Sequence, residues 1–154
     1  MRSLDAANKT EPVWIAVCCL MIILALVGGV GLTSGLVLHH LVQTLPLWVG
    51  VVLGFRRSPA TGWIGLPVFL FWLVMMVLIW MYLLGIAHAL SGYFSPFVIG
   101  MTIVVGIGSV VGIAMFWRLK SSLTLTSAAA LFVMVAAIQW LCFRAGFWSP
   151  IALR

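Results

Sequence analysis

The stretch VWIAVCCLMIILALVGGVGL, residues 13–32, decides the fold because it is a long apolar run without a charged residue. A helix rises about 1.5 Å per residue, so about 20 apolar residues cross a hydrocarbon core of about 30 Å. The run does not alternate polar with apolar residues, and backbone in lipid must satisfy its own hydrogen bonds, so a helix is expected. We predict a retained membrane-spanning helix, since the apolar core of a cleaved signal peptide is shorter.

Composition extends this interpretation to the whole chain. Of its 154 residues 65% are hydrophobic and 6% charged, with a mean hydropathy of +1.30, whereas about a quarter of residues are charged in soluble domains. The sequence predicts an all-α integral membrane protein, with a single transmembrane helical domain over residues 1–154. Four more apolar stretches give a bundle of five transmembrane helices, at 13–32, 35–55, 63–84, 97–117 and 123–143. The alternative is four spans, with residues 35–55 interfacial or re-entrant, because that stretch carries the most polar side chains.

Positive charges favour the five-span arrangement. Lys and Arg concentrate in the short cytoplasmic loops of membrane proteins. Five spans place most of these residues on one side: Arg2, Lys9, Arg56, Arg57, Arg118 and Lys120. Arg144 and Arg154 fall on the other side. We therefore expect a cytoplasmic N-terminus, and a bacterial inner (plasma) membrane, because the leader carries Asp5 and Glu11 whereas organellar transit peptides are poor in acids.

The scarcity of acids argues against most catalytic chemistry. Asp5 and Glu11 are the only acidic side chains, and both precede the first apolar stretch. Paired-carboxylate catalysis and proton relays within the membrane therefore lack their usual groups. The chain has neither a GxxxxGK phosphate loop nor a nucleophile elbow. Its net charge of +6 is spread over loops, so nucleic-acid binding is not expected, and we lean against an enzyme.

Glycines indicate where helices approach closely. Small residues four apart share one helix face and let a neighbouring backbone come near. The chain contains three such pairs, Gly31 with Gly35, Gly50 with Gly54, and Gly108 with Gly112. The stretch 97–117 is densest in small residues, so we expect it to be the central helix of the bundle or its contact with a partner chain.

A polar cluster interrupts the second span. The segment LHHLVQTLPLW, residues 38–48, contains His39 and His40, and Gln43 follows them at helical spacings that share a face. His88 also falls in the outer half of the predicted bundle. Pro46 is expected to bend the span and open space beside it, because proline frees a carbonyl one turn earlier.

These histidines allow several interpretations. Haem or copper ligation by His39 or His40 together with His88 requires the third helix to break, because straight helices leave the rings about 14 Å apart. The cluster otherwise lines an outward-facing pocket for a lipid, quinone or other apolar ligand, or consists of ordinary interfacial residues. We favour a non-enzymatic accessory or assembly subunit of a larger membrane complex, in contact with the lipid bilayer and with other membrane chains or a second copy. The alternative is a binding or carrier protein for a small apolar or redox ligand.

Overall fold

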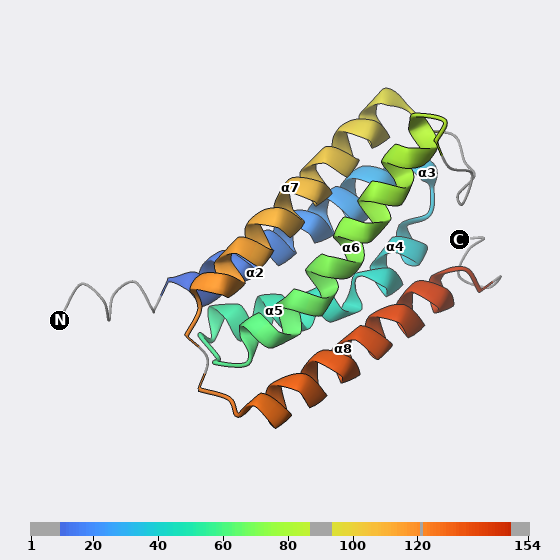
Figure 1. Ribbon diagram of the computed structural model, residues 1–154. Helices are drawn as coiled ribbons and strands as arrows, with labels where there is room; N and C mark the ends of the chain where they lie inside the picture. The colour runs from blue at the N-terminus through green and yellow to red at the C-terminus, as the bar shows by residue number, and fades with distance from the viewer. Residues whose placement is uncertain (1–9, 87–93, 121, 149–154) are drawn as a thin grey trace.

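The chain forms a bundle of antiparallel helices (Figure 1). The computed structural model describes residues 10–86, 94–120 and 122–148, and these contain helices and no strand. The elements, in chain order, are α2 (Glu11–Ile23), the π-helix η1 (Leu24–Gly31), α3 (Leu32–Ser34), α4 (Val37–Gln43), α5 (Leu45–Phe55), α6 (Thr61–Leu83), α7 (Pro96–Arg118) and α8 (Leu125–Gly146).

The apolar stretches predicted from the sequence are helical, which confirms the all-α class. Among the described residues, four helices are long and apolar enough to cross a membrane: the continuous run Glu11–Ser34, α6, α7 and α8. The pair α4 and α5 makes a fifth if it counts as one bent span. That these helices cross a membrane remains a prediction.

The α4–α5 pair runs along the bundle against the first helix. At one end, a Cβ placed on Gly31 would lie 3.2 Å from Val37 Cα at the start of α4. At the other end, a Cβ on Gly54 would lie 2.5 Å from the Pro12 carbonyl oxygen, at the start of α2. Since these contacts join opposite ends of the two segments, α4 and α5 together pass the full length of the first helix.

Pro46 causes the break between α4 and α5. Proline has no backbone N–H to donate to the carbonyl of Val42, and the Leu47 N–H bonds to Thr44 O at 2.9 Å instead of to Gln43 O. The axes of α4 and α5 therefore differ by 56°. This confirms the bend that the sequence predicts at Pro46. The break leaves the Gln43 carbonyl without its helical partner in the middle of the bundle.

The first helix changes its winding at η1. Two hydroxyl side chains stabilise the C-terminal end of this helix. Thr33 donates to Gly29 O at 2.8 Å, and Ser34 donates to Val30 O at 2.7 Å. Gly35 then turns the chain at φ 72, and a Cβ there would meet nothing within 4 Å. The prediction that Gly35 packs helices together is therefore wrong, because its role is the left-handed turn, which disfavours a side chain.

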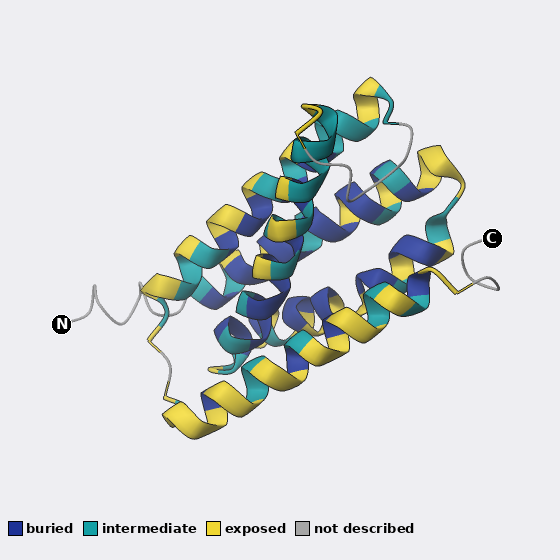
Figure 2. Ribbon diagram, turned by 45° about the vertical axis from the view of Figure 1, so that its right-hand side comes forward, coloured by how far each residue is buried: buried dark blue, intermediate teal, exposed yellow. Residues whose placement is uncertain are grey.

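The first helix lies deepest in the bundle, as the dark blue residues along it show in Figure 2. It has the largest buried share of the four long helices, so the expectation that residues 97–117 form the central helix is wrong. In α7, a Cβ on Gly108 would come 2.9 Å from Met21 of α2, and Gly112 faces Phe69 of α6. Contact of α7 with a partner chain stays a prediction.

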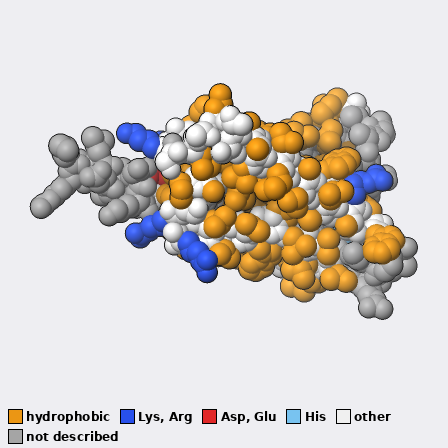
Figure 3. Space-filling model, turned by 90° about the horizontal axis from the view of Figure 1, so that it is seen from below, with side chains coloured by type: hydrophobic (Ala, Val, Ile, Leu, Met, Phe, Trp, Pro, Cys, Tyr) orange, Lys and Arg blue, Asp and Glu red, His pale blue; other side chains and the backbone are white. Residues whose placement is uncertain are grey.

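The outside of the bundle is an apolar band between two charged ends (Figure 3). Exposed large apolar side chains occur on every long helix, among them Leu24, Val74, Ile107, Val133 and Leu141. The α5–α6 connection, with Arg56 and Arg57, lies beside the end of α7, because a Cβ on Gly62 would touch Leu119. Arg144 lies at the opposite end, near the end of α8. This distribution suits a bundle whose sides face lipid.

Candidate functional site

A partly open cavity lies between the helices, in the half of the bundle that contains α4. Its volume is about 230 Å³, and all five passes of the chain contribute to its wall. The wall is mostly apolar, with Met75, Met101, Phe143 and Phe147 among its members. The polar side chains that line it are His39, His40, Gln43, Trp72 and Thr102. The cavity therefore gathers three of the four candidate ligand-binding residues, while His88 lies outside the described residues.

His39 links α4 to the end of α8. The ring is 8% exposed, and its Nδ1 lies 2.6 Å from the backbone carbonyl oxygen of Gly146. Carbonyls in the last turn of a helix have no partner within that helix, so this one accepts the Nδ1 proton. Phe147 packs edge-on against the ring at a centroid distance of 4.9 Å. With the proton on Nδ1, Nε2 of a neutral ring carries an open lone pair.

His40 is held in the same tautomer by its own helix. Its Nδ1 donates to the Leu36 carbonyl at 2.9 Å, so Nε2 is again the acceptor nitrogen. The rings of His39 and His40 meet edge to face with centroids 4.9 Å apart. Two neighbouring imidazoles that line the cavity thus each keep a lone pair that no hydrogen bond within the described part of the chain uses.

Gln43 stands at the break in the second pass. Its backbone carbonyl, which Leu47 N–H leaves for Thr44 O at the break, accepts a hydrogen bond from Nε2 of Gln139 on α8 at 3.1 Å. Its side-chain Nε2 is buried and has no hydrogen-bond partner in the described structure. A buried donor without a partner costs about 1–3 kcal/mol. Gln43 therefore lines the cavity and holds an unused amide donor buried behind its surface.

Trp72 supplies a second unused donor. This α6 residue is 3% exposed, and its indole Nε1 is also buried without a partner among the described residues. Thr102 of α7 lines the cavity too, but its hydroxyl already donates to the Ile99 carbonyl at 2.7 Å. Thr102 can therefore only accept a further hydrogen bond. The residues that line the cavity thus hold two unpaired buried donors, on Gln43 and Trp72, and two unpaired acceptors, on the histidines.

Such a wall suits a small apolar molecule with polar atoms at its edge. An apolar cavity of about 150 Å³ admits benzene, so 230 Å³ has room for one substituted ring. Haem, with four pyrroles, is larger than this cavity. In the described ranges, no three His, Cys, Asp or Glu side chains come together as a metal site. The copper hypothesis needs His88 and therefore lies outside the described residues.

Three features of the site were not predicted from the sequence. Gln139 is fully buried and satisfies the broken helix, and its only signal is that it is the sole amide in the stretch 123–143. Trp72 carries no signal in the sequence that separates it from the other tryptophans of the chain. The π-helix, whose Leu26 and Val30 line the cavity, has no sequence signature beyond its glycines. Such π-helical segments are rare and often lie at functional sites.

Comparison with protein-family models, with curated proteins and with solved structures gives no match to this chain.

Proposed function

We propose that the protein is a five-span membrane bundle that binds one small ring-bearing ligand of the quinone class in the cavity beside α4. One observation carries this proposal. The residues that line a largely apolar cavity include two with an unpaired buried donor and two imidazoles with a free acceptor nitrogen. Ligand sites in proteins are typically apolar cavities with a few converging polar groups.

A quinone ring matches both kinds of group. Its carbonyl oxygens accept hydrogen bonds, which suits the N–H groups of Gln43 and Trp72. The reduced form carries hydroxyl groups that donate, which suits Nε2 of His39 and His40. Neither oxidation state leaves a charge in the membrane, which agrees with a cavity whose described lining residues include no acidic or basic side chain other than the histidines.

The membrane arrangement is part of the proposal. The α4–α5 pair passes along the whole first helix, which supports a broken span over a re-entrant loop. Arg56, Arg57, Arg118 and Lys120 then share the cytoplasmic side with the N-terminus. The cavity lies toward the opposite face of a bacterial inner membrane. The exposed apolar side chains are spread around the bundle, as contact with lipid requires, and they mark no single face for a partner chain. An accessory role in a larger complex therefore stays a prediction.

The test is the binding of tetramethyl-para-benzoquinone to the protein in lipid nanodiscs, measured by calorimetry. Full substitution of the ring leaves no open carbon for attack by cysteine thiolates. Trp72→Phe removes a donor at the cavity, and we expect it to weaken binding about tenfold, the worth of one hydrogen bond to a buried group.

Trp63→Phe is the matched control. Trp63 also has a buried indole N–H without a partner in the described structure, but it lies near Phe116, away from the cavity. Both variants lose the same atoms and the same kind of donor. We expect the control to bind within about twofold of the unmodified protein. Equal losses in the two variants, or no saturable binding to the unmodified protein, would contradict the proposal.

A further inference from the structure

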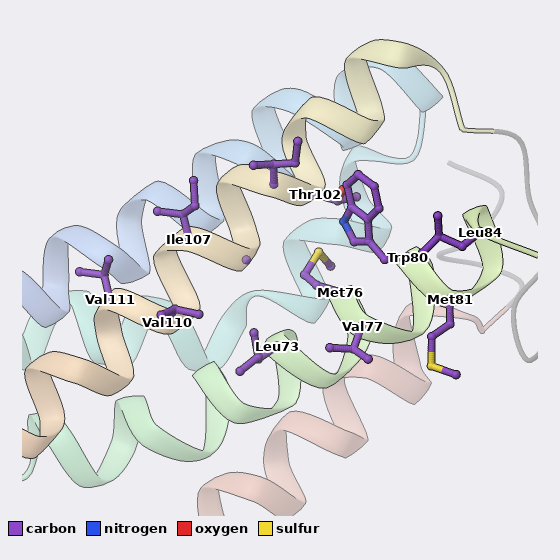
Figure 4. A pocket seen from close by; sticks show the side chains of 12 residues that line it. Leu73, Met76, Val77, Trp80, Met81, Leu84, Thr102, Ile107, Val110 and Val111 are labelled. Carbon is purple, nitrogen blue, oxygen red and sulfur yellow. The ribbon is translucent and has the colours of Figure 1, made fainter. Parts of the chain in front are cut away.

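A long groove runs along the outside of the bundle between α6 and α7. Its volume is about 560 Å³, and Leu73, Val77, Ile107 and Val110 belong to its apolar lining (Figure 4). On α6 the groove extends from Leu73 to Leu84, which corresponds to roughly 16 Å at the rise of a helix. Among the described residues that line it, Thr102 alone has a hydroxyl group, and that hydroxyl is already bonded within α7.

The groove and the internal cavity share part of their walls. Met76 on α6 and Thr102 on α7 line both spaces, so these two side chains stand between them. Figure 4 shows Met76 and Trp80 on α6 beside Thr102 on α7. Met76 is unbranched and flexible, and it can change rotamer without a backbone movement. The boundary between groove and cavity is therefore one side chain thick on each helix.

We infer that the ligand carries an apolar chain, with its ring in the cavity and the chain passing between Met76 and Thr102 into the α6–α7 groove. This inference rests on the proposed function and names the substrate class more closely, as an alkyl- or prenyl-substituted quinone.

Continuity with the cavity identifies the occupant of the groove. A free lipid chain gains little by moving from the bilayer into an apolar groove, because both surroundings are equally apolar. A chain tethered to a bound ring is different, since its arrival in the groove is intramolecular and takes place at a high effective concentration. The tethered chain therefore displaces ordinary lipid from the groove.

The experiment compares two probes and two matched variants. The probes are tetramethyl-para-benzoquinone and the same ring with one methyl replaced by a decyl chain. Gly106→Leu fills the groove, because Gly106 lines it and a Cβ there meets nothing within 4 Å. Gly100→Leu is the control, since Gly100 is on the same helix, has the same open space, and lines neither groove nor cavity.

We expect Gly106→Leu to weaken binding of the decyl probe by about tenfold or more and to leave the chain-free ring within about twofold. Gly100→Leu should leave both probes unchanged. Each probe is compared with itself across variants, so its partition into lipid cancels. If Gly106→Leu leaves the decyl probe unaffected while the ring still binds, the chain lies elsewhere. The inference about the groove then fails, and the proposed function stands. If the ring itself does not bind, both fail.

Discussion

The substitution Gly54→Ala tests the path of the second pass more sharply than any other change. A Cβ at this position would lie 2.5 Å from the Pro12 carbonyl oxygen and 2.6 Å from Ala16 Cβ. Real Cβ atoms essentially never come closer than 3.0 Å to another heavy atom, so α5 must move away from α2 by roughly 0.5 Å or more. The neighbour is backbone at the start of a helix and cannot rotate aside.

Overpacking of this kind typically costs about 1–3 kcal/mol, against which alanine regains about 0.5–1 kcal/mol of helix propensity. We expect Gly54→Ala to lower the free energy of unfolding by about 1 kcal/mol. Gly100→Ala is the control: a Cβ there meets nothing within 4 Å, so its free energy of unfolding should stay equal or rise slightly.

The assay is equilibrium unfolding of the detergent-solubilised protein by SDS, followed by tryptophan fluorescence. If residues 35–55 lay flat at the membrane surface, Gly54 would not contact α2. Equal stability of Gly54→Ala and Gly100→Ala would therefore refute the full-length pass and, with it, the wall that α4 gives to the cavity.

Three other changes probe the site and the topology. Gln43→Leu is expected to stabilise the ligand-free protein by about 1 kcal/mol in the same unfolding assay, because it removes a buried amide donor without a partner; destabilisation would show that this donor is satisfied. His39→Phe keeps the aromatic contact but loses the hydrogen bond to the end of α8, which should cost about 0.6–1.7 kcal/mol and speed amide exchange in the last turn of α8. Cysteines at Ser34 and Pro59 should react with an impermeant maleimide from opposite sides of the membrane, whereas reaction from one side would refute an odd number of crossings between them.

The helices of this bundle are readable from the sequence because apolar length is a simple signal. Each of the stretches predicted from residue 13 onward coincides with a helix or, for residues 35–55, with a bent pair. The bend itself follows from Pro46, whose missing N–H has the same consequence in any helix. The roles of the glycines were harder to predict, since spacing does not say which neighbour approaches: Gly54 permits a close contact, whereas Gly35 makes a turn.

The candidate site could be predicted only in part. His39, His40 and Gln43 stand out because polar side chains are rare in this chain. Gln139 and Trp72 belong with them only through long-range contacts of α8 and α6, which no local pattern reveals. The tautomers of the histidines likewise depend on carbonyls that the fold supplies, one of them more than a hundred residues away.

The most direct test of the account counts the rings that the cavity holds. Nanodiscs with and without the protein are equilibrated with tetramethyl-para-benzoquinone, and the bound quinone is measured by its absorbance after separation from the free probe. The account predicts a saturable excess of one ring per chain over the empty nanodiscs. Uptake that rises linearly with concentration and equals that of empty nanodiscs would contradict it, because the cavity beside α4 would then bind nothing.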